Sequence, residues 1–267
     1  MDCTLKNSCR MTKKKKILQR IDTPGGRAYA LMQEGEKPLF LPSVTTVLSL
    51  KHSNYLAELK EKIGEKDLQR ISEKAAKRGT AMHLFLENYM ICMKQKGDSD
   101  SCLLYTQRKS TDALLHDMDK ERVDIGRSLF YNVYHSGIFD KIKKVIFTEK
   151  FLHSEKFLFA GTTDFGFLDT ENYIVITDFK SASSPRDEET IDKYKCQVAA
   201  YAIAFEEMFQ KPVQRGEVWI SHPDGMQCIE VAGEEMEEKK KEFVELCVAY
   251  HSMWDTKPFE DFLALDI

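Results

Sequence analysis

Two acidic residues and one lysine in the second half of the chain have types and spacing that could do chemistry. Asp164 closes the segment Gly161-Thr-Thr-Asp164, and Asp178 and Lys180 form an Asp-x-Lys motif further along. Both segments lie in runs rich in Val, Ile, Phe and Tyr, which are typical of β-strands. Because successive side chains of a strand point to opposite faces, we expect Asp178 and Lys180 on one face and Phe179 on the other.

The turn-forming residues 169–172 between these two runs predict that the strands pair as a hairpin. A residue near 177 or 178 then lies opposite Asp164, which brings two carboxylates and an ammonium group to one point. Like charges placed opposite each other destabilise a sheet, and a divalent cation between the carboxylates removes that cost. Oxygen ligands suit Mg²⁺, or Mn²⁺ in its place, and Mg²⁺ also binds phosphate oxygens.

These three groups together indicate phosphodiester cleavage. A metal held by Asp164 and Asp178 would polarise a phosphate ester and lower the pKa of a bound water. Lys180 would position that water or neutralise charge that develops on the phosphate. The alternative for the Asp-x-Lys motif is a solvated ion pair that contributes about 0–1 kcal/mol to stability.

Two pairs of residues spaced four apart place polar groups on helix faces. His83 and Glu87 lie in one predicted helix, and the neutral imidazole of His83 is a candidate metal ligand. Gln197 and Tyr201 lie in a helix that follows the Asp-x-Lys strand, where an amide and a hydroxyl can contact a phosphate, the backbone or the catalytic lysine. The competing interpretations are a surface ion pair for the first pair and an ordinary core position for Tyr201.

Two further groups of residues could bind the phosphates of a nucleic acid. Ser43 is a predicted N-cap, and with Thr45 it places hydroxyls and amides at a helix N-terminus, where anions bind. N-capping alone explains Ser43 equally well. Lys74, Lys77 and Arg78 precede the His83 helix by a few residues, and Lys77 and Arg78 are the expected DNA contacts. The alternative is a solvated helix face, because glutamates are interleaved with the lysines.

The elements that position these residues follow from periodicity and turn residues. Residues 1–26 are polar and basic and are expected to form a flexible lead-in, and residues 27–267 are expected to form a single α/β domain. A helical region is expected at about 43–136, a sheet at about 144–231 and a closing helix at about 234–254. Predicted helices lie at 55–78, 79–90 and 191–209, with a polar break at 95–101 and a helix or helix pair at 111–135. Predicted strands lie at 27–41 (a hairpin), 144–152, 157–168, 173–180, 217–220 and 227–231.

Composition restricts the classes of protein that fit. The net charge of −4 does not fit a uniformly basic DNA-coating protein, but it allows a locally basic groove. No apolar run reaches the roughly 20 residues of a membrane span, so no membrane association is expected. The seven cysteines include no CxxC pair, which gives no support for an iron–sulfur cluster and indicates a reducing compartment. The N-terminal residues lack the features of a secretory or transit signal, which favours a cytoplasmic over a mitochondrial location.

Five short motifs, taken in order, resemble those of the RecB-type exonuclease branch of the PD-(D/E)xK superfamily, and in particular the mitochondrial genome maintenance exonucleases and their phage and bacterial relatives. The motifs are Pro-Ser-Val-Thr at 42–45, Gly-Thr-x-x-His-x-x-x-Glu at 79–87, Gly-x-x-Asp at 161–164, Asp-x-Lys at 178–180 and Gln-x-x-x-Tyr at 197–201. Each motif is weak alone, but five in this order are specific. The resemblance implies a restriction-endonuclease-like α/β core with a central mixed sheet flanked by helices.

The resemblance also implies a role for each motif residue. It implies three side chains as metal ligands: His83, Asp164 and Asp178. Lys180 is implied as the catalytic lysine, with the Phe179 carbonyl as a further metal ligand. Gln197 and Tyr201 are implied as accessory residues near Lys180 and the substrate.

Two glutamates are additional accessory candidates. Glu87 ends the histidine motif, and Glu149 lies on the strand before Asp164. A solvent-exposed strand position is the simpler interpretation of Glu149. The chain lacks the cysteine cluster of the iron–sulfur relatives and has no GxxxxGK[ST] phosphate loop of a helicase motor.

The leading functional interpretation is a metal-dependent DNA exonuclease that acts on single strands or DNA ends in replication, repair or recombination. One alternative is a structure-selective or double-strand-resecting nuclease of phage recombination. Another is a catalytically silent DNA-binding module, which the intact set of candidate catalytic residues disfavours. Such an enzyme would work alone or beside a separate helicase, polymerase or recombinase, in the cytoplasm of a bacterial or phage-infected cell.

Overall fold

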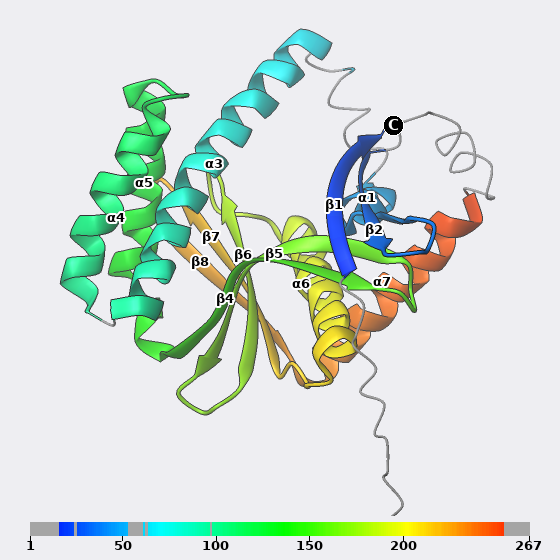
Figure 1. Ribbon diagram of the computed structural model, residues 1–267. Helices are drawn as coiled ribbons and strands as arrows, with labels where there is room; N and C mark the ends of the chain where they lie inside the picture. The colour runs from blue at the N-terminus through cyan, green and yellow to red at the C-terminus, as the bar shows by residue number, and fades with distance from the viewer. Residues whose placement is uncertain (1–15, 24–25, 53–60, 62–63, 97, 254–267) are drawn as a thin grey trace, which may run out of the picture.

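A five-stranded mixed sheet forms the centre of the molecule. The computed structural model describes residues 16–23, 26–52, 61, 64–96 and 98–253 (Figure 1). The sheet has the order β4-β5-β6-β7-β8. Its strands are β4 (Ile142–Ser154), β5 (Phe159–Asp169), β6 (Ile174–Ser181), β7 (Arg215–His222) and β8 (Gly225–Ala232). Neighbours are antiparallel except β6 and β7, which are parallel and joined by helix α6 (Glu188–Phe209). The predicted α/β class with a mixed sheet is confirmed.

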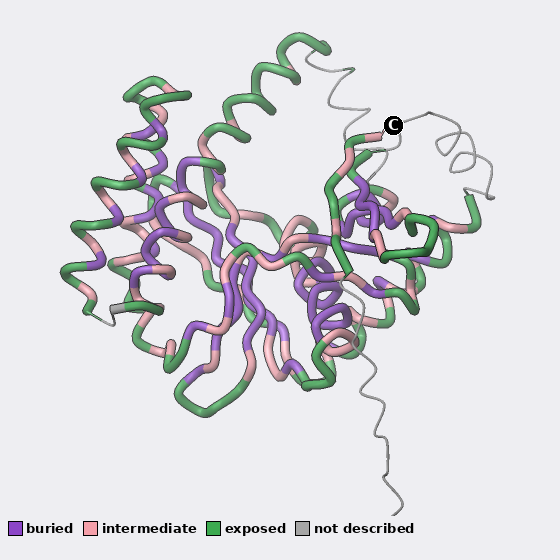
Figure 2. The backbone as a smooth tube through the Cα atoms, in the orientation of Figure 1, coloured by how far each residue is buried: buried purple, intermediate pink, exposed green. Residues whose placement is uncertain are grey.

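Helices cover both faces of this sheet (Figures 1 and 2). On one face lie α6 and α7 (Gly233–Met253); on the other lie α3 (Glu65–Lys96) and α5 (Lys120–His135), with α4 (Ser99–Leu114) packed against them. Strand residues alternate between the two cores: Ile176 and Val218 pack towards α6, whereas Val175 and Trp219 pack towards α3 and α5. Because both faces are covered, the central strands bury apolar side chains on both sides.

A smaller antiparallel sheet precedes the main one. It consists of β1 (Lys16–Thr23), β2 (Gly26–Gln33) and β3 (Leu39–Pro42), and its apolar residues Tyr29, Leu31 and Leu41 pack against Ala160 of β5. The hairpin predicted at 27–41 is confirmed. The predicted flexible lead-in is wrong for residues 16–23, because this segment pairs along its whole length with β2 and packs Leu18 against the same cluster. Residues 1–15 lie outside the described residues.

The helical region departs from the prediction around Gly79. Helix α3 continues through this glycine from Glu65 to Lys96, where two helices were expected. Glycine inside a helix costs about 0.5–1 kcal/mol relative to alanine, and the adjacent Met82 and Phe85, both fully buried, outweigh that cost. The predicted break is also shorter, because α4 begins at Ser99 and is capped by Asp98. The first residues of the helix predicted at 55–78 lie outside the described residues.

Two further observations concern the cysteines and the membrane. Cys92 of α3 and Cys102 of α4 form a disulfide with a Cα–Cα distance of 5.4 Å, a pairing that the sequence spacing alone did not indicate. Within the described chain, no helix has both the length and the apolar character needed to cross a bilayer.

Candidate metal centre

Asp164 and Asp178 lie where β5 and β6 part. The pairing of these two strands ends at Phe165 and Thr177, one residue before Asp164 and Asp178 would meet. Beyond this point β5 continues alongside β4, and β6 continues alongside β7. The predicted register is therefore confirmed, and the divergence of the strands leaves room for two carboxylates that would otherwise be forced together.

Asp178 is held by groups from β6 and α6. Its carboxylate is buried, its Oδ1 accepts a hydrogen bond from Gln197 Nε2 at 2.9 Å, and it forms an ion pair with Lys180. The same Gln197 nitrogen donates to the Tyr201 hydroxyl at 3.0 Å. The Lys180 ammonium also lies 5.2 Å from the centroid of the Tyr194 ring. The shared face of Asp178 and Lys180 and the i, i+4 pair on α6 are confirmed, although Gln197 contacts Asp178 and not Lys180.

Asp164 is held by groups from β6 and α3. Its Oδ2 accepts a hydrogen bond from the backbone N–H of Phe179 at 2.6 Å, and its Oδ1 lies 3.5 Å from His83 Nδ1. The other ring nitrogen of His83, Nε2, donates to the Phe179 carbonyl at 2.9 Å. Helix α3 thus places His83 against Phe179, the middle residue of the Asp-x-Lys motif.

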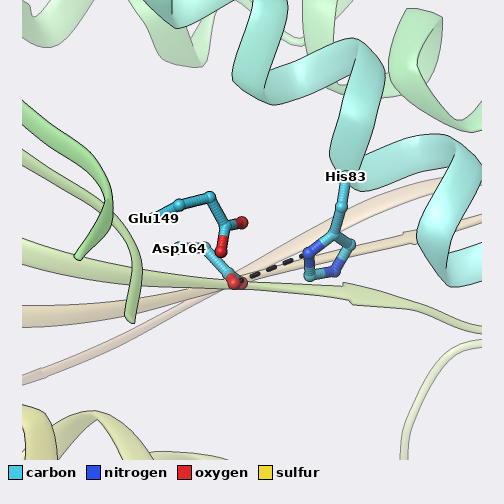
Figure 3. A group of neighbouring side chains, drawn as sticks. All are labelled: His83, Glu149 and Asp164. Atoms are coloured by element: carbon cyan, nitrogen blue, oxygen red, sulfur yellow. Dashed lines mark ion pairs between the residues drawn. The ribbon is translucent and has the colours of Figure 1, made fainter. Parts of the chain in front are cut away.

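Glu149 completes a cluster with His83 and Asp164 (Figure 3). One ligand atom from each of the three side chains lies within 4.8 Å of the others. The neighbours of Glu149 on β4 pair with the neighbours of Asp164 on β5, so Glu149 lies opposite Asp164 on the adjacent strand. The φ angle of Glu149 is +46°, in the left-handed region that non-glycine residues rarely adopt. Strained conformations of this kind concentrate at functional sites.

Asp178 is not one of the three clustered groups, although the resemblance implied it as a ligand. The carboxylates of Asp164 and Asp178 carry like charges, and each has its own partners: the Phe179 amide for Asp164, and Gln197 and Lys180 for Asp178. Asp178 therefore lies beside the cluster, tied to α6. Glu87, four residues after His83, is near enough that its charge contributes to the raised pKa of Glu149.

The pKa values of these groups record a local excess of negative charge. Burial, together with the charge of Asp164, raises the pKa of Glu149 to about 7. Burial also raises the pKa of Asp178 to about 6, against the opposing effect of Lys180. Burial disfavours the charged form of His83, but the Asp164 carboxylate outweighs burial and raises the pKa of His83 to about 9. In the absence of a cation, this cluster holds protons that the same groups would lose in water.

This donor set fits a hard divalent cation. Carboxylate oxygens are the preferred ligands of Mg²⁺ and Mn²⁺, and an imidazole is compatible with Mn²⁺. A cation that displaces the bound protons also relieves the repulsion between Glu149 and Asp164. The residues that would hold the cation are His83, Glu149 and Asp164, with Asp178 beside them.

Two arginines lie beyond Lys180 at the end of β6. Arg78 of α3 has its Nε 3.5 Å from the hydroxyl of Ser181. Burial and the nearby charge of Arg186 lower the pKa of Arg78. Neither arginine forms an ion pair with a carboxylate in the part of the chain that the structure describes. Arg186 was missed from the sequence, although it is the sole cation in the polar loop before α6. Lys77, by contrast, is exposed on α3.

Ser43 caps a short helix, and its hydroxyl forms hydrogen bonds within that helix. It precedes α1 (Val44–Leu48), which is followed by the 3-10 turn η1 (Ser49–His52). Its Oγ accepts a hydrogen bond from the Thr46 amide at 3.0 Å and bonds to Thr45 Oγ1 at 2.9 Å, and the residue is 2% exposed. The predicted N-cap is confirmed, and the buried hydroxyl leaves no surface for a phosphate. Thr45 is exposed.

Comparison with known proteins identifies the family of the chain. The profile of the PD-(D/E)XK nuclease superfamily matches residues 43–256, a range that includes all the clustered side chains. Among solved structures, a candidate exonuclease from Eubacterium rectale is similar at 11% identity and a TM-score of 0.41, over 65% of this chain and 65% of that one. The protein SSO0001 is similar at 13% identity and a TM-score of 0.29, over 61% of this chain and 70% of that one. No curated protein matches the chain. The extent of the profile match shows that the chain belongs to the PD-(D/E)XK nuclease superfamily.

Proposed function

We propose that the protein is a Mg²⁺- or Mn²⁺-dependent nuclease that hydrolyses the phosphodiester bonds of DNA and acts on single strands or free ends. The observation that carries the proposal is the cluster of His83, Glu149 and Asp164 beside the ion pair of the buried Asp178 and the partly buried Lys180. Carboxylates gathered in this way destabilise a fold, so their presence is better explained by a site for a cation and a phosphate-bearing substrate.

Each side chain has a separate task in this proposal. His83, Glu149 and Asp164 would hold the divalent cation, whose charge polarises a phosphate ester and lowers the pKa of a water. Burial opposes the charged form of Lys180, but Asp178 and Asp164 outweigh it and raise the lysine pKa. Lys180 therefore keeps its proton at neutral pH. Its ammonium can donate to a phosphate oxygen and stabilise the negative charge that develops there.

Gln197 and Tyr201 act as positioning residues. The Gln197 amide holds one oxygen of Asp178, and the Tyr201 hydroxyl fixes the Gln197 amide in turn. The remaining oxygen of Asp178 is then directed to Lys180. This chain of contacts keeps the lysine aligned through α6, without a flexible loop.

Arg78 and Arg186 support a phosphate-bearing substrate of some length. Two guanidinium groups that repel each other without a carboxylate between them are stabilised when an anion binds to both. A phosphate next to the one that is cleaved supplies this anion. Contacts of this type carry no information about base identity, so we expect cleavage to be independent of sequence.

Digestion of end-labelled DNA tests the proposed function. The substrates are 5′- and 3′-labelled single strands, the corresponding duplex and a covalently closed single-stranded circle of the same sequence, each with Mg²⁺. We expect the linear strands to be degraded from an end and the circle to resist, with no cleavage by a Lys180→Ala control. Equal degradation of the linear strands and the closed circle would identify an endonuclease instead. DNA binding without cleavage in Mg²⁺ and Mn²⁺ would identify a silent binding module and contradict the proposal.

A further inference from the structure

A hollow lies where β4 and the neighbouring ends of β5 and β6 meet the C-terminal end of α6. Its volume is about 520 Å³. β4 is an edge strand of the five-stranded sheet, so one side of it has no β-partner in the described chain. The floor of the hollow is apolar and includes Phe205 and Phe209. Its rim carries four lysines: Lys94, Lys144, Lys150 and Lys211.

The charge around this hollow is uncompensated. No acidic residue lines it, and its lysines form no ion pair with the residues that the structure describes, although Lys94 donates to the Ile146 carbonyl at 2.9 Å. Four cations around one hollow are unexpected in a chain with a net charge of −4. The hollow between α6 and α7, by comparison, mixes three lysines with four glutamates. The hollow at β4 therefore favours an anionic ligand.

Phe209 adds an accessible aromatic ring to this cationic rim. The residue is 40% exposed at the end of α6, and its ring packs on Phe205 with a centroid distance of 4.7 Å. The ammonium of Lys150 lies 5.8 Å from the Phe209 ring centroid. A ligand that suits this surface has a flat apolar group for the ring and negative charge for the lysines. The unpaired bases and phosphates of a single-stranded nucleic acid have this combination.

The hollow comes close to the candidate metal centre through Lys150. Lys150 directly follows Glu149 on β4, so their Cα atoms lie about 3.8 Å apart. From Lys150 to Lys144 the strand edge extends by roughly 20 Å. Helix α6 carries Gln197 near one end of this path and Phe209 at the other. A strand with one phosphate at the metal centre would therefore continue along this edge.

Lysines on an edge strand have another known use, which is to prevent pairing with the edge of a second molecule. That use requires charge alone. It accounts neither for the hollow nor for Phe209, whose exposed ring beside an edge strand would favour association. A ligand site accounts for the charge, the hollow and the ring together.

We propose that the hollow at β4 is a binding subsite for an unpaired stretch of the nucleic acid that the metal centre cleaves. The lysines contact its phosphates, and Phe209 stacks on a base. This inference rests on the proposed nuclease function and makes it more specific, because a base within a duplex is not free to stack on Phe209. The subsite selects single-stranded over double-stranded substrate.

Equilibrium binding of fluorescent single strands of about 16 nucleotides tests the subsite, with Ca²⁺ in place of Mg²⁺ to suppress cleavage. The double variant Lys144→Gln/Lys211→Gln should lower the slope of log K against log salt by about 1.4, since each lost phosphate contact contributes about 0.7 for a single strand. The matched control Lys156→Gln/Lys241→Gln alters the other hollow by the same charge and should leave the slope unchanged. Phe209→Leu should weaken binding by about tenfold, and Phe209→Trp should restore it.

Two further measurements use the same protein preparations. One is binding of a duplex of the same length, and the other is Mg²⁺-dependent cleavage of a linear single strand. Neither Phe209→Leu nor Phe209→Trp should change the affinity for the duplex appreciably. If the wild type cleaves DNA but the lysine and Phe209 variants keep wild-type affinity and salt slope, the subsite is wrong and the nuclease function stands. If the wild type neither binds nor cleaves DNA, both proposals are wrong.

Discussion

Replacing Gly161 with alanine should disturb the site through Tyr201. An alanine Cβ at this position would lie 2.7 Å from Tyr201 Cε1 and 3.2 Å from Val44 Cγ2. Carbon atoms in ordinary contact are about 3.5–4.0 Å apart, so the overlap with the Tyr201 ring is roughly 1 Å. The ring is buried and cannot move outward, and its hydroxyl accepts the hydrogen bond of Gln197. Displacement of Tyr201 therefore also displaces the amide that holds Asp178.

Overpacking of this kind costs about 1–3 kcal/mol. In a chain of this size, that loss lowers the melting temperature by roughly 2–12 °C. Gly79→Ala is a matched control, because its Cβ would meet only the Ser181 hydroxyl at 3.4 Å, an ordinary contact. Alanine is preferred over glycine inside a helix by about 0.5–1 kcal/mol, so Gly79→Ala should raise the melting temperature slightly.

Thermal unfolding followed by circular dichroism in metal-free buffer measures both variants, and cleavage of a labelled single strand measures the effect on the site. We expect Gly161→Ala to lose stability and activity together. A Gly161→Ala protein that melts at or above the wild-type temperature would refute the placement of Tyr201 against β5. A Gly79→Ala protein that melts well below the wild type would refute the continuous course of α3.

Three further predictions concern the metal, pH and salt. Cleavage should require Mg²⁺ or Mn²⁺, and Ca²⁺ should support DNA binding without turnover; full activity after exhaustive chelation would be inconsistent with the proposed centre. The rise in melting temperature on adding Mg²⁺ should be larger at pH 8 than at pH 6. The raised pKa values of Glu149 (about 7) and Asp178 (about 6) make the metal-free protein lose stability as the pH rises through them, and a bound cation takes the place of the lost protons. An equal rise at both pH values would contradict this prediction. Arg78→Glu should lower the salt dependence of DNA binding more than Lys77→Glu, because Arg78 lies beside Ser181 whereas Lys77 is exposed. Equal effects would show that Arg78 does not contact the substrate.

The parts of the site that depend on local periodicity could be predicted from the sequence. Strand alternation placed Asp178 and Lys180 on one face, and the hairpin turn set the register that brings Asp164 beside them. Helical spacing placed Gln197 and Tyr201 together. In each case the deciding contacts are between residues whose relative positions follow from regular geometry.

The parts that depend on irregular backbone could not be predicted. Glu149 was a candidate only because it lies on the strand before Asp164. Its left-handed backbone and the register shifts of β4 have no signal in the sequence. Arg186 is placed by a loop whose course is set by a hydrogen bond from its own amide to Gln227. The pairing of Cys92 with Cys102 depends on how α4 turns back along α3 after residue 98.

The central claim is that the carboxylates and Lys180 at the end of β6 cleave phosphodiester bonds. The most direct measurement is the rate of Mg²⁺-dependent cleavage of labelled single-stranded DNA by purified wild type, Asp178→Ala and Lys180→Ala, with folding checked by circular dichroism. We predict that both variants fold and that the cleavage rate of each falls at least about 100-fold. Lys180→Ala removes the charge that acts on the reacting phosphate, and Asp178→Ala removes the charge that holds Lys180 in place. A cleavage rate close to wild type in either folded variant would contradict the assignment.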